Sequence, residues 1–499
     1  MINAIDSFVL HGVEAHDCRV EVAVSSDHKP STTIVGLPDA AVRESVERVR
    51  AAIESSGYPF PFGRVVVNLA PADLRKEGPV YDLPIALALL GSSGAVTQEG
   101  MRHARSMLIA GELALDGGVR SVRGIIGLGI LASSQGRSVI VPHSDAAAAS
   151  MVDGLDVRGA TSLSAVVEHL NGSHMLPMVV SAPRAMQEES QATLEAIKGQ
   201  ESTKRALIVS AAGWHNLIML GPPGCGKTLM ARALADLLPP LERESMLELL
   251  QIRSCAGHVD LDEFAQARRP MRAPHHTASG PAIIGGGACP HPGEVSLAHH
   301  GVLFLDELPE FDRRVLEALR QPLEDRSVTV ARVNGTVRFP ARFLLVSAAN
   351  PSYRKSGLAG ADRAYMRRLS SPLLDRVDLH VEVRPVPVWR LKCQLVTGPA
   401  TSDARRQVRI AVERQRARQG AFPNGMLDGR QLDVYAQLSP DAEDALVQSV
   451  ESLELSARGW DTIRRVARTI ADLDDRNRIE VSDVSEAVSY RLLDRACGQ

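Results

Sequence analysis

A glycine-rich turn between an apolar segment and a helical segment is the strongest chemical signal in the chain. Residues 221–228 follow the pattern G-x-x-x-x-G-K-T. The apolar run at 217–220 before the turn predicts a strand, and the Leu-, Met- and Ala-rich run after it predicts a helix. This strand–loop–helix context is typical of a P-loop, so we expect a nucleotide to bind here.

The residue types in this turn suit a triphosphate. Glycines allow backbone N–H groups to approach an anionic phosphate closely, and the helix N-terminus adds partial positive charge. We expect Lys227 to reach the β and γ phosphates and the Thr228 hydroxyl to coordinate Mg²⁺. The expected nucleotide-binding residues are Gly221, Pro222, Pro223, Gly224, Cys225, Gly226, Lys227 and Thr228.

A second chemical signal is a pair of carboxylates at the end of an apolar segment. Residues 302–305 read as a buried strand, and Asp306 and Glu307 follow it directly. Such a pair is often only an acidic helix cap, but its position about eighty residues after the P-loop favours catalysis. We expect Asp306 to hold the Mg²⁺ shell and Glu307 to orient or deprotonate the attacking water.

Three further features could belong to the same site. A strand at 343–347 leads to Asn350, a polar residue that could sense hydrolysis near the γ-phosphate. Alternating β-branched residues on both sides of Asn334-Gly335 predict a hairpin at 327–339. Arg376 lies between acids, and this pattern fits either a surface salt bridge or an arginine finger that reaches a neighbouring subunit's nucleotide.

The elements that position these residues divide the chain into an α/β part, a linker, a P-loop part and a helical part. In the first part we expect strands at 20–24, 32–35, 65–67 and 138–141, and a helix whose apolar residues at 42, 46, 49 and 53 are spaced by four, three and four. This part has no phosphate loop of its own, and the linker contains Pro, Ser and Gln with weak periodicity. The predicted boundaries are 1–171, 172–193, 194–385 and 386–499.

Composition restricts the class of protein. A length of 499 residues with 44% hydrophobic and 23% charged residues is ordinary for a soluble globular protein, and the scattered cysteines fit a reducing cytoplasm. No apolar run is long enough to cross a membrane, and the six cysteines are scattered without a C-x-x-C pair. The formal net charge of −3 gives no bulk attraction to nucleic acid, so any such binding needs local basic patches.

The sequence resembles the magnesium-chelatase-like AAA+ ATPases, in particular their ComM/YifB branch. The stretches that carry the resemblance include TTIVGLPDAAVRESVERVRAAI, HNLIMLGPPGCGKT, RPMRAPHHT, GEVSLAHHGVLFLDELPEF and SSPLLDRVDL. The resemblance implies an AAA+ αβα sandwich with a helix-2 insert at 270–287, a hairpin before sensor 1, and a C-terminal helical lid. It also implies sensor 1 at Asn350, a trans finger at Arg376 and sensor 2 at Arg458.

The N-terminal part resembles the Lon protease domain, an α/β fold like domain 2 of ribosomal protein S5. Active members have a serine after the Gly-Pro of one motif and a lysine in a later motif. Here Val80 follows Gly78-Pro79, and the segment RGIIGL around Gly124 contains no lysine. We therefore expect this domain to be inactive as a peptidase and available to a protein partner.

The family resemblance also predicts the function. It implies a hexameric, Mg²⁺-dependent ATPase that acts on single-stranded or branched DNA as a helicase or branch-migration factor in recombination or natural transformation. Arg332 and Arg338, which flank the hairpin turn, are the expected DNA contacts. The alternatives are the motor subunit of a magnesium chelatase and an ATP-dependent scaffold that remodels a protein partner.

One departure from the family pattern concerns zinc. Many ComM/YifB proteins have a cysteine cluster after the sensor-1 Asn-Pro, and here that stretch reads PSYRKSGLAGADRAYMRRLS, without cysteine. We therefore expect no zinc. The basic residues in its place could contact phosphate groups without a metal, and they are Arg354, Lys355, Arg363, Arg367 and Arg368.

Overall fold

The computed structural model divides the chain into two compact units. The first unit contains residues 1–186 and 243–266, and the second contains residues 187–242 and 267–499. Within them the structure describes residues 2–25, 31–180, 193–257, 259–261, 267–287, 290–332, 335–350, 368–387 and 398–491. Most of the predicted linker therefore lies outside the described residues.

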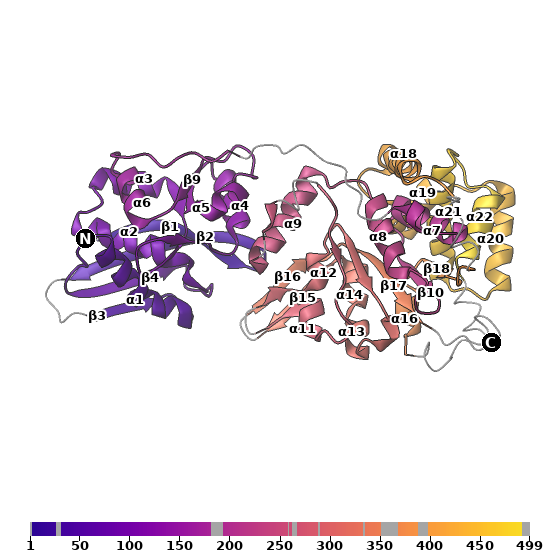
Figure 1. The fold of residues 1–499 in the computed structure, drawn as a ribbon, viewed down its shortest axis with the longest axis horizontal. Helices are drawn as coiled ribbons and strands as arrows, with labels where there is room; N and C mark the ends of the chain where they lie inside the picture. The colour runs from indigo at the N-terminus through magenta and orange to yellow at the C-terminus, as the bar shows by residue number, and fades with distance from the viewer. Residues whose placement is uncertain are drawn as a thin grey trace. The chain divides into compact units, whose positions relative to one another are not determined.

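The first unit is an α/β structure with separate sheets (Figure 1). Its largest sheet has the order β1-β2-β4-β3, and β5-β8-β9 form a parallel sheet. The strands are β1 (Ile2–His11), β2 (Glu14–Ser25), β3 (Ser31–Val35), β4 (Arg64–Ala70), β5 (Met107–Ile109), β6 (Glu112–Leu113), β7 (Val119–Arg120), β8 (Ser138–Pro142) and β9 (Val157–Ala160). The helices are α1 (Ala40–Ser55), η1 (Pro79–Tyr81), α2 (Asp82–Ser93), α3 (Gln98–Arg105), α4 (Ile125–Ser134), α5 (His143–Ala149) and α6 (Leu163–Leu170).

The local patterns of this unit predicted its elements well. The predicted helix with apolar residues at spacings of four, three and four is α1. Its N-cap is Asp39, whose Oδ1 accepts a hydrogen bond from Val42 N at 2.7 Å. The predicted strands at 20–24, 32–35, 65–67 and 138–141 are confirmed as parts of β2, β3, β4 and β8.

One helix of the first unit comes from a later stretch of the sequence, between segments that belong to the second unit. Helix α9 (Arg243–Ala256) packs against α4, and Gln251 Nε2 donates to the carbonyl of Val13 at 2.7 Å. Gly124 N donates to the carbonyl of Ser254 at 3.0 Å. The predicted boundaries, which kept 194–385 as one continuous domain, did not include this insertion, because nothing in the composition of α9 distinguishes it from its neighbours.

The second unit is built on a parallel sheet of five strands in the order β11-β14-β17-β10-β18. They are β11 (Met271–Arg272), β14 (Val302–Leu305), β17 (Leu344–Ala349), β10 (Leu217–Leu220) and β18 (Leu379–Glu382). Every residue of β10, β14 and β17 is buried, so both faces of the sheet are covered, as a parallel sheet requires. The mixed α/β architecture is consistent with a P-loop AAA+ fold.

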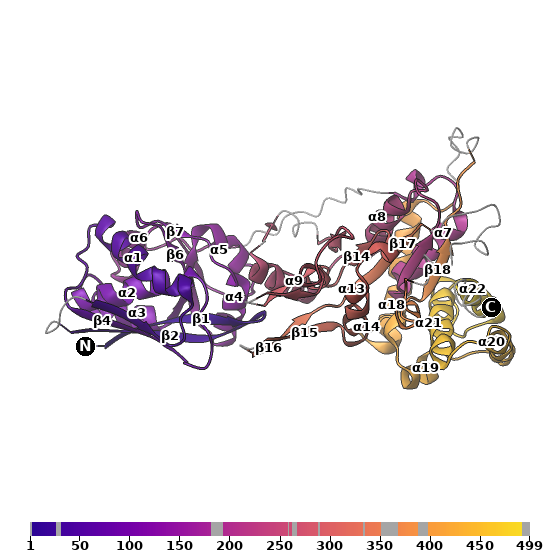
Figure 2. The ribbon, with the colours of Figure 1, turned by 90° about the horizontal axis from the view of Figure 1, so that it is seen from below.

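Short elements precede and follow the sheet strands. They are η2 (Leu194–Ala196), α7 (Glu201–Gly213), α8 (Lys227–Leu237), α11 (Gly280–Ile284), β12 (Gly285–Gly286), β13 (His291–Pro292), α12 (Glu294–Leu297), η3 (Leu308–Glu310), α13 (Arg313–Ala318), α14 (Arg320–Asp325), β15 (Ser327–Arg332), β16 (Gly335–Pro340) and α16 (Ser371–Leu374). The antiparallel pair β15–β16 confirms the predicted hairpin, and it extends from α14 (Figure 2).

The range 270–287, for which the sequence predicted a helix-2 insert, is not a single separate element. The range 270–287 begins with β11, which belongs to the central sheet. The antiparallel pair β12–β13 lies between α11 and α12 and reaches Pro292. A two-residue strand in a Gly- and Pro-rich segment gives no periodic signal, so the pattern could not reveal that β11 belongs to the core.

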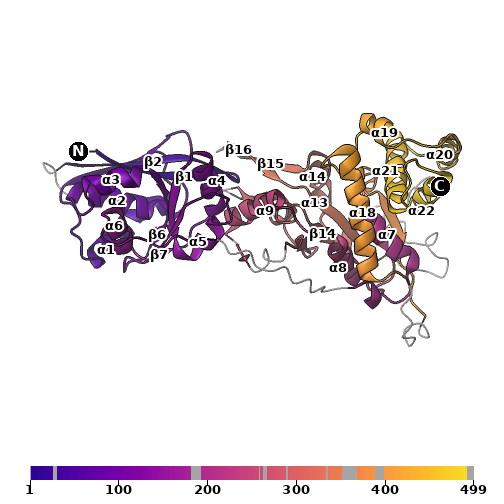
Figure 3. The same ribbon diagram turned by 90° about the horizontal axis from the view of Figure 1, so that it is seen from above.

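The C-terminal residues 398–491 are helical, as the sequence predicted. They form α18 (Thr401–Gln419), η5 (Asn424–Met426), α19 (Gly429–Tyr435), α20 (Pro440–Ser452), α21 (Ala457–Leu473) and α22 (Val481–Ser489). Helices α18 and α21 both pack against α7 (Figure 3). Their apolar side chains share one hydrophobic cluster with Met219 and Val346 of the sheet, so these helices belong to the same compact unit as the P-loop.

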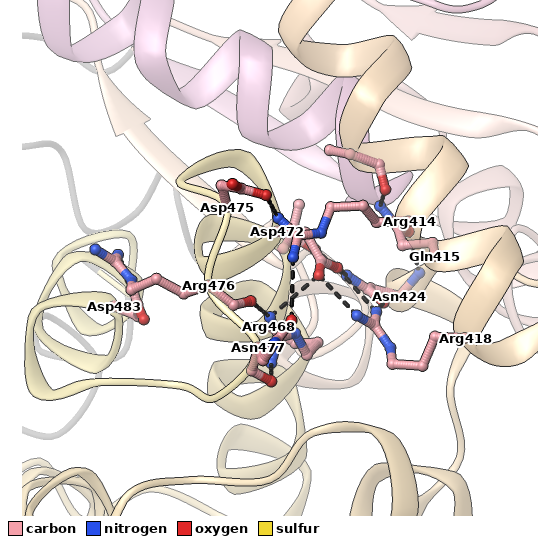
Figure 4. A network of polar contacts seen from close by, with 12 residues as sticks. Arg414, Gln415, Arg418, Asn424, Arg468, Asp472, Asp475, Arg476, Asn477 and Asp483 are labelled. Atoms are coloured by element: carbon pink, nitrogen blue, oxygen red, sulfur yellow. Dashed lines mark hydrogen bonds and ion pairs between the residues drawn. The ribbon is translucent and has the colours of Figure 1, made fainter.

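A buried polar network connects α18, η5 and α21 (Figure 4). Asp472 is 1% exposed, and its carboxylate accepts hydrogen bonds from Arg418 at 2.7 and 2.8 Å and from Asn424 Nδ2 at 2.9 Å. Arg468, which is fully buried, donates to the same carboxylate at 3.1 Å. One negative charge therefore compensates two guanidinium groups inside the unit.

We expect Asp472→Asn to destabilise the second unit by about 3 kcal/mol, because it removes the counter-charge of the buried Arg468 and of the partly buried Arg418. For a unit of this size that corresponds to roughly 6–12 °C in melting temperature, measured by calorimetry on the full chain. Asp403→Asn is the matched control, since it removes a more than half-exposed partner of Arg406 and is expected to cost less than about 1 kcal/mol. Equal shifts for the two variants would show that the network does not stabilise the unit.

Candidate active site

The glycine-rich turn at 221–228 lies between β10 and α8, as the sequence predicted, and we call it the phosphate-binding turn after its expected role. Gly224 and Gly226 have φ values of +80° and +84°, which side chains other than glycine rarely adopt. At Gly221, an added Cβ would lie 2.3 Å from the carbonyl oxygen of Val383, so the backbone that follows the neighbouring strand β18 leaves no space for a side chain. Both constraints explain why the turn needs its glycines.

Lys227 begins α8 and folds back over the turn. Its Nζ donates to the carbonyl oxygens of Gly221 and Pro222, both at 2.9 Å, and the residue is 6% exposed. Burial lowers the pKa of this ammonium group, and the nearby carboxylates of Asp306 and Glu307 oppose the shift. A phosphate oxygen could replace the carbonyl oxygens as the partner of Nζ.

A cavity of about 460 Å³ opens beside this turn. Its volume lies in the range of small-molecule sites. The lining residues are Ala196, Ile197, Lys198, Gln200, Pro222, Pro223, Gly224, Cys225, Gly226, Leu229, Met230, Pro385 and Val386. The sequence indicated the phosphate-binding turn but not the other lining residues, which come from segments far apart in the chain.

The predicted carboxylates lie at the same edge of the sheet as the turn. Strand β17 pairs with both β14 and β10, so the residues that follow these three parallel strands come together. Asn350 Nδ2 donates to Glu307 Oε1 at 3.3 Å. The sequence prediction that Lys227, Asp306, Glu307 and Asn350 share one site is therefore consistent with the fold.

Glu307 has a second polar neighbour that the sequence did not reveal. His276 follows β11, and its Nδ1 lies 3.5 Å from Glu307 Oε2. The imidazole rings of His275 and His276 have centroids 4.1 Å apart. Asn350 contacts one oxygen of this partly exposed carboxylate and His276 lies beside the other, so the two side chains together fix its orientation. Only the pairing of β11 with β14 brings this histidine to Glu307, so its position could not be read from local spacing.

The two remaining candidates, Arg376 and Arg458, lie elsewhere. The carbonyl of Arg376 accepts a hydrogen bond from Asn216 Nδ2 at 2.9 Å, and Asn216 directly precedes β10. Because β10 has four residues, it separates this edge of the sheet from the phosphate-binding turn by about 13 Å. Arg376 and Arg458 instead contact one carboxylate, that of Glu324, each at 2.5 Å.

Comparison with known proteins identifies the family. The family models "Subunit ChlI of Mg-chelatase", "Magnesium chelatase, subunit ChlI" and its C-terminal part match residues 20–145, 193–391 and 398–491. The uncharacterized protein YifB of Escherichia coli (strain K12) is 42% identical over 97% of this chain and 96% of its own length. The competence protein ComM of Haemophilus influenzae is 40% identical with the same coverage.

The chain belongs to the ComM/YifB family of magnesium-chelatase-like proteins. A more distant relative, the chloroplastic magnesium-chelatase subunit ChlI of Chlamydomonas reinhardtii, is 26% identical over 60% of this chain and 74% of its own length. Membership in this AAA+ family implies ATPase activity that uses ATP and Mg²⁺. No helix in the described part of the chain is both long and apolar enough to cross a membrane.

The residues of the site fit such a nucleotide. A buried ammonium group lies on the phosphate-binding turn, and two carboxylates that could take part in Mg²⁺ coordination lie close enough to influence its pKa. Thr228, which follows Lys227 at the start of α8, is the expected hydroxyl ligand of the metal ion.

The predicted DNA contacts lie on the β15–β16 hairpin. Arg338 is exposed, pairs with Thr329 in the register, and donates from Nε to Ser327 Oγ at 2.9 Å. The backbone of Arg332 pairs with Gly335, but its side chain lies outside the described residues. Of the five basic residues predicted to contact phosphate groups, four also lie outside them, and Arg368 forms an ion pair with Glu310 at 2.9 Å.

Proposed function

We propose that this protein is an ATP-driven motor that acts on DNA. It would work in the cytosol as a hexameric ring. The observation that carries the proposal is the separation of its candidate catalytic residues. Lys227, Asp306 and Glu307 lie at one edge of the sheet of unit 2, and Arg376 lies at the opposite edge. An active site that needs both sets is complete only when two chains meet.

In this mechanism each residue acts on ATP bound between two chains. Lys227 binds the β and γ phosphates, and Glu307, oriented by Asn350 and His276, positions the attacking water and accepts its proton. Bound Mg²⁺, held by Thr228 and Asp306, supplies charge neutralisation on the phosphates. Arg376 and Arg458 of the neighbouring chain stabilise the negative charge that develops in the transition state.

The β15–β16 hairpin is the feature that favours DNA as the substrate of the proposed motor. Thr329, Ala331, Thr336 and Arg338 form its exposed face, while Val328, Val330, Val337 and Phe339 are buried on the other. A projecting arm with a polar, basic face suits contact with a phosphate backbone. Because one relative is named a competence protein, we propose that the motor drives branch migration when single-stranded DNA is integrated during recombination or natural transformation.

The N-terminal unit is proposed to be a Lon-like domain without peptidase activity. Val80, at the position of the serine in active members, is an apolar residue that is 9% exposed. The RGIIGL segment supplies Ile125 and Ile126, which are also buried. A unit without these reactive groups could still bind a protein partner.

The two alternatives are less well supported. A chelatase motor would explain the similarity to ChlI, but that relative matches 60% of this chain, whereas YifB and ComM match 97%. A scaffold that remodels a protein partner would need ATPase stimulation by that partner rather than by DNA. Measuring the ATPase rate with and without single-stranded and branched DNA separates both alternatives from the proposed motor.

We expect Arg338→Ala to retain the basal ATPase rate and to lose most of its stimulation by DNA. Loss of one phosphate contact per chain is expected to weaken DNA binding roughly tenfold or more, because a hydrogen bond between charged groups contributes about 1.5–3 kcal/mol. Arg409→Ala is the matched control, since Arg409 is 69% exposed on α18 and its side chain pairs with Glu413. Full DNA stimulation of the Arg338 variant would exclude this hairpin as the DNA contact.

A further inference from the structure

Two arginines that are far apart in sequence meet on one carboxylate. Arg376 precedes β18 and Arg458 lies in the first turn of α21, and the Nη2 atoms of both lie 2.5 Å from Glu324 Oε1. The hydrogen bonds from Arg376 and Arg458 lower the pKa of Glu324, so this carboxyl group is ionised. The cluster therefore has two positive charges and one negative charge.

The arrangement leaves a buried donor unused. The side chain of Arg376 is 9% exposed, and Nη1 donates to the carbonyl of Pro372. Its Nε is buried and has no hydrogen-bond partner among the described residues. A buried donor without an acceptor is costly, and together with the excess positive charge it indicates that this cluster is incomplete without an anionic group from outside.

Glu324 also lies at the root of the hairpin. It belongs to the last turn of α14, three residues before Ser327, where β15 begins. The carbonyl of Arg326 accepts a hydrogen bond from Ala341 N at 2.8 Å and so joins the two ends of the hairpin. Ser327 Oγ in turn accepts the hydrogen bond from Arg338. Glu324 is therefore connected to the proposed DNA contact Arg338 through the three residues that end with Ser327.

We propose that Glu324 is a latch that holds Arg376 and Arg458 in the isolated chain and releases them to the triphosphate of a neighbouring chain. This inference rests on the proposed function, because it requires the two arginines to act on a neighbour's nucleotide. Glu324 and the γ-phosphate compete for the same guanidinium groups, so transfer of the arginines frees the end of α14. Phosphate loss after hydrolysis returns them to Glu324 and reverses the shift of the hairpin.

The test is the isosteric variant Glu324→Gln in the full chain, with ATPase rate measured against protein concentration. Removal of the competing charge is expected to lower the concentration that gives half-maximal rate by about threefold to tenfold, the effect of losing one or two partly exposed ion pairs. The latch also predicts that DNA stimulates this variant less than the wild type. Glu324→Asp keeps the charge and is expected to give intermediate behaviour.

Glu317→Gln is the matched control, because Glu317 lies on the preceding helix α13 and forms its ion pair with Arg320 rather than with Arg376 or Arg458. An unchanged or higher half-maximal concentration for Glu324→Gln would overturn the latch. A lower concentration with full DNA stimulation would overturn its connection to the hairpin. Wild-type ATP turnover by Arg376→Ala would contradict the proposed function itself, whatever the Glu324 variants show.

Discussion

Replacing Lys227 with alanine is expected to reduce the affinity for ATP by at least roughly a hundredfold while the protein stays folded. The ammonium group is the one cation that the phosphate-binding turn itself provides, and charge-assisted hydrogen bonds to phosphate contribute about 1.5–3 kcal/mol each. The fold should persist because Nζ donates to two carbonyl oxygens of the turn and forms no ion pair with a carboxylate among the described residues. Calorimetric titration with Mg-ATP and a thermal melt measure the two effects.

Arg232→Ala is the control for this variant, because Arg232 lies on the same helix and is exposed. We expect it to bind ATP normally. Normal hydrolysis by the Lys227 variant would overturn the assignment of the active site.

Replacing Arg376 with alanine is expected to leave ATP binding intact and to lower turnover by about a thousandfold or more, the usual effect of losing an arginine finger. ATP binding should be intact because Arg376 lies at the opposite end of the sheet strands from the phosphate-binding turn of its own chain. A mixture of the Lys227 and Arg376 variants should regain part of the activity, since some interfaces then combine an intact turn with an intact arginine.

Arg384→Ala is the matched control, because Arg384 follows β18, is 77% exposed and pairs with Glu382. It should retain wild-type turnover. If the Arg376 variant also turned over at the wild-type rate, its role would be limited to the salt bridge with Glu324.

The sequence predicted those parts of the site in which local pattern and function coincide. A glycine turn between β10 and α8, and two acids after β14, are each contained in a few consecutive residues. Their approach follows from a general property of parallel sheets, in which the carboxyl ends of neighbouring strands lie at one edge. The hairpin was predictable for the same reason, because its turn and alternation are local.

The remaining features depend on contacts between distant segments. His276 reaches Glu307 only because the two-residue strand β11 pairs with β14, and such a short strand has no periodicity. Glu324 reads as an ordinary acid on a helix, and its two arginine partners follow it by 52 and 134 residues. Helix α9 carries no pattern that assigns it to the first unit rather than the second. In each case the decisive fact is a tertiary pairing that local composition does not encode.

The most direct test of the central claim is a structure of the assembled protein with Mg²⁺ and a non-hydrolysable ATP analogue. The account predicts that the γ-phosphate lies between Lys227 of one chain and Arg376 of the next, with Arg376 released from Glu324. A nucleotide bound by Lys227 while Arg376 of every chain remains on Glu324, with no second chain at the phosphate, would contradict it.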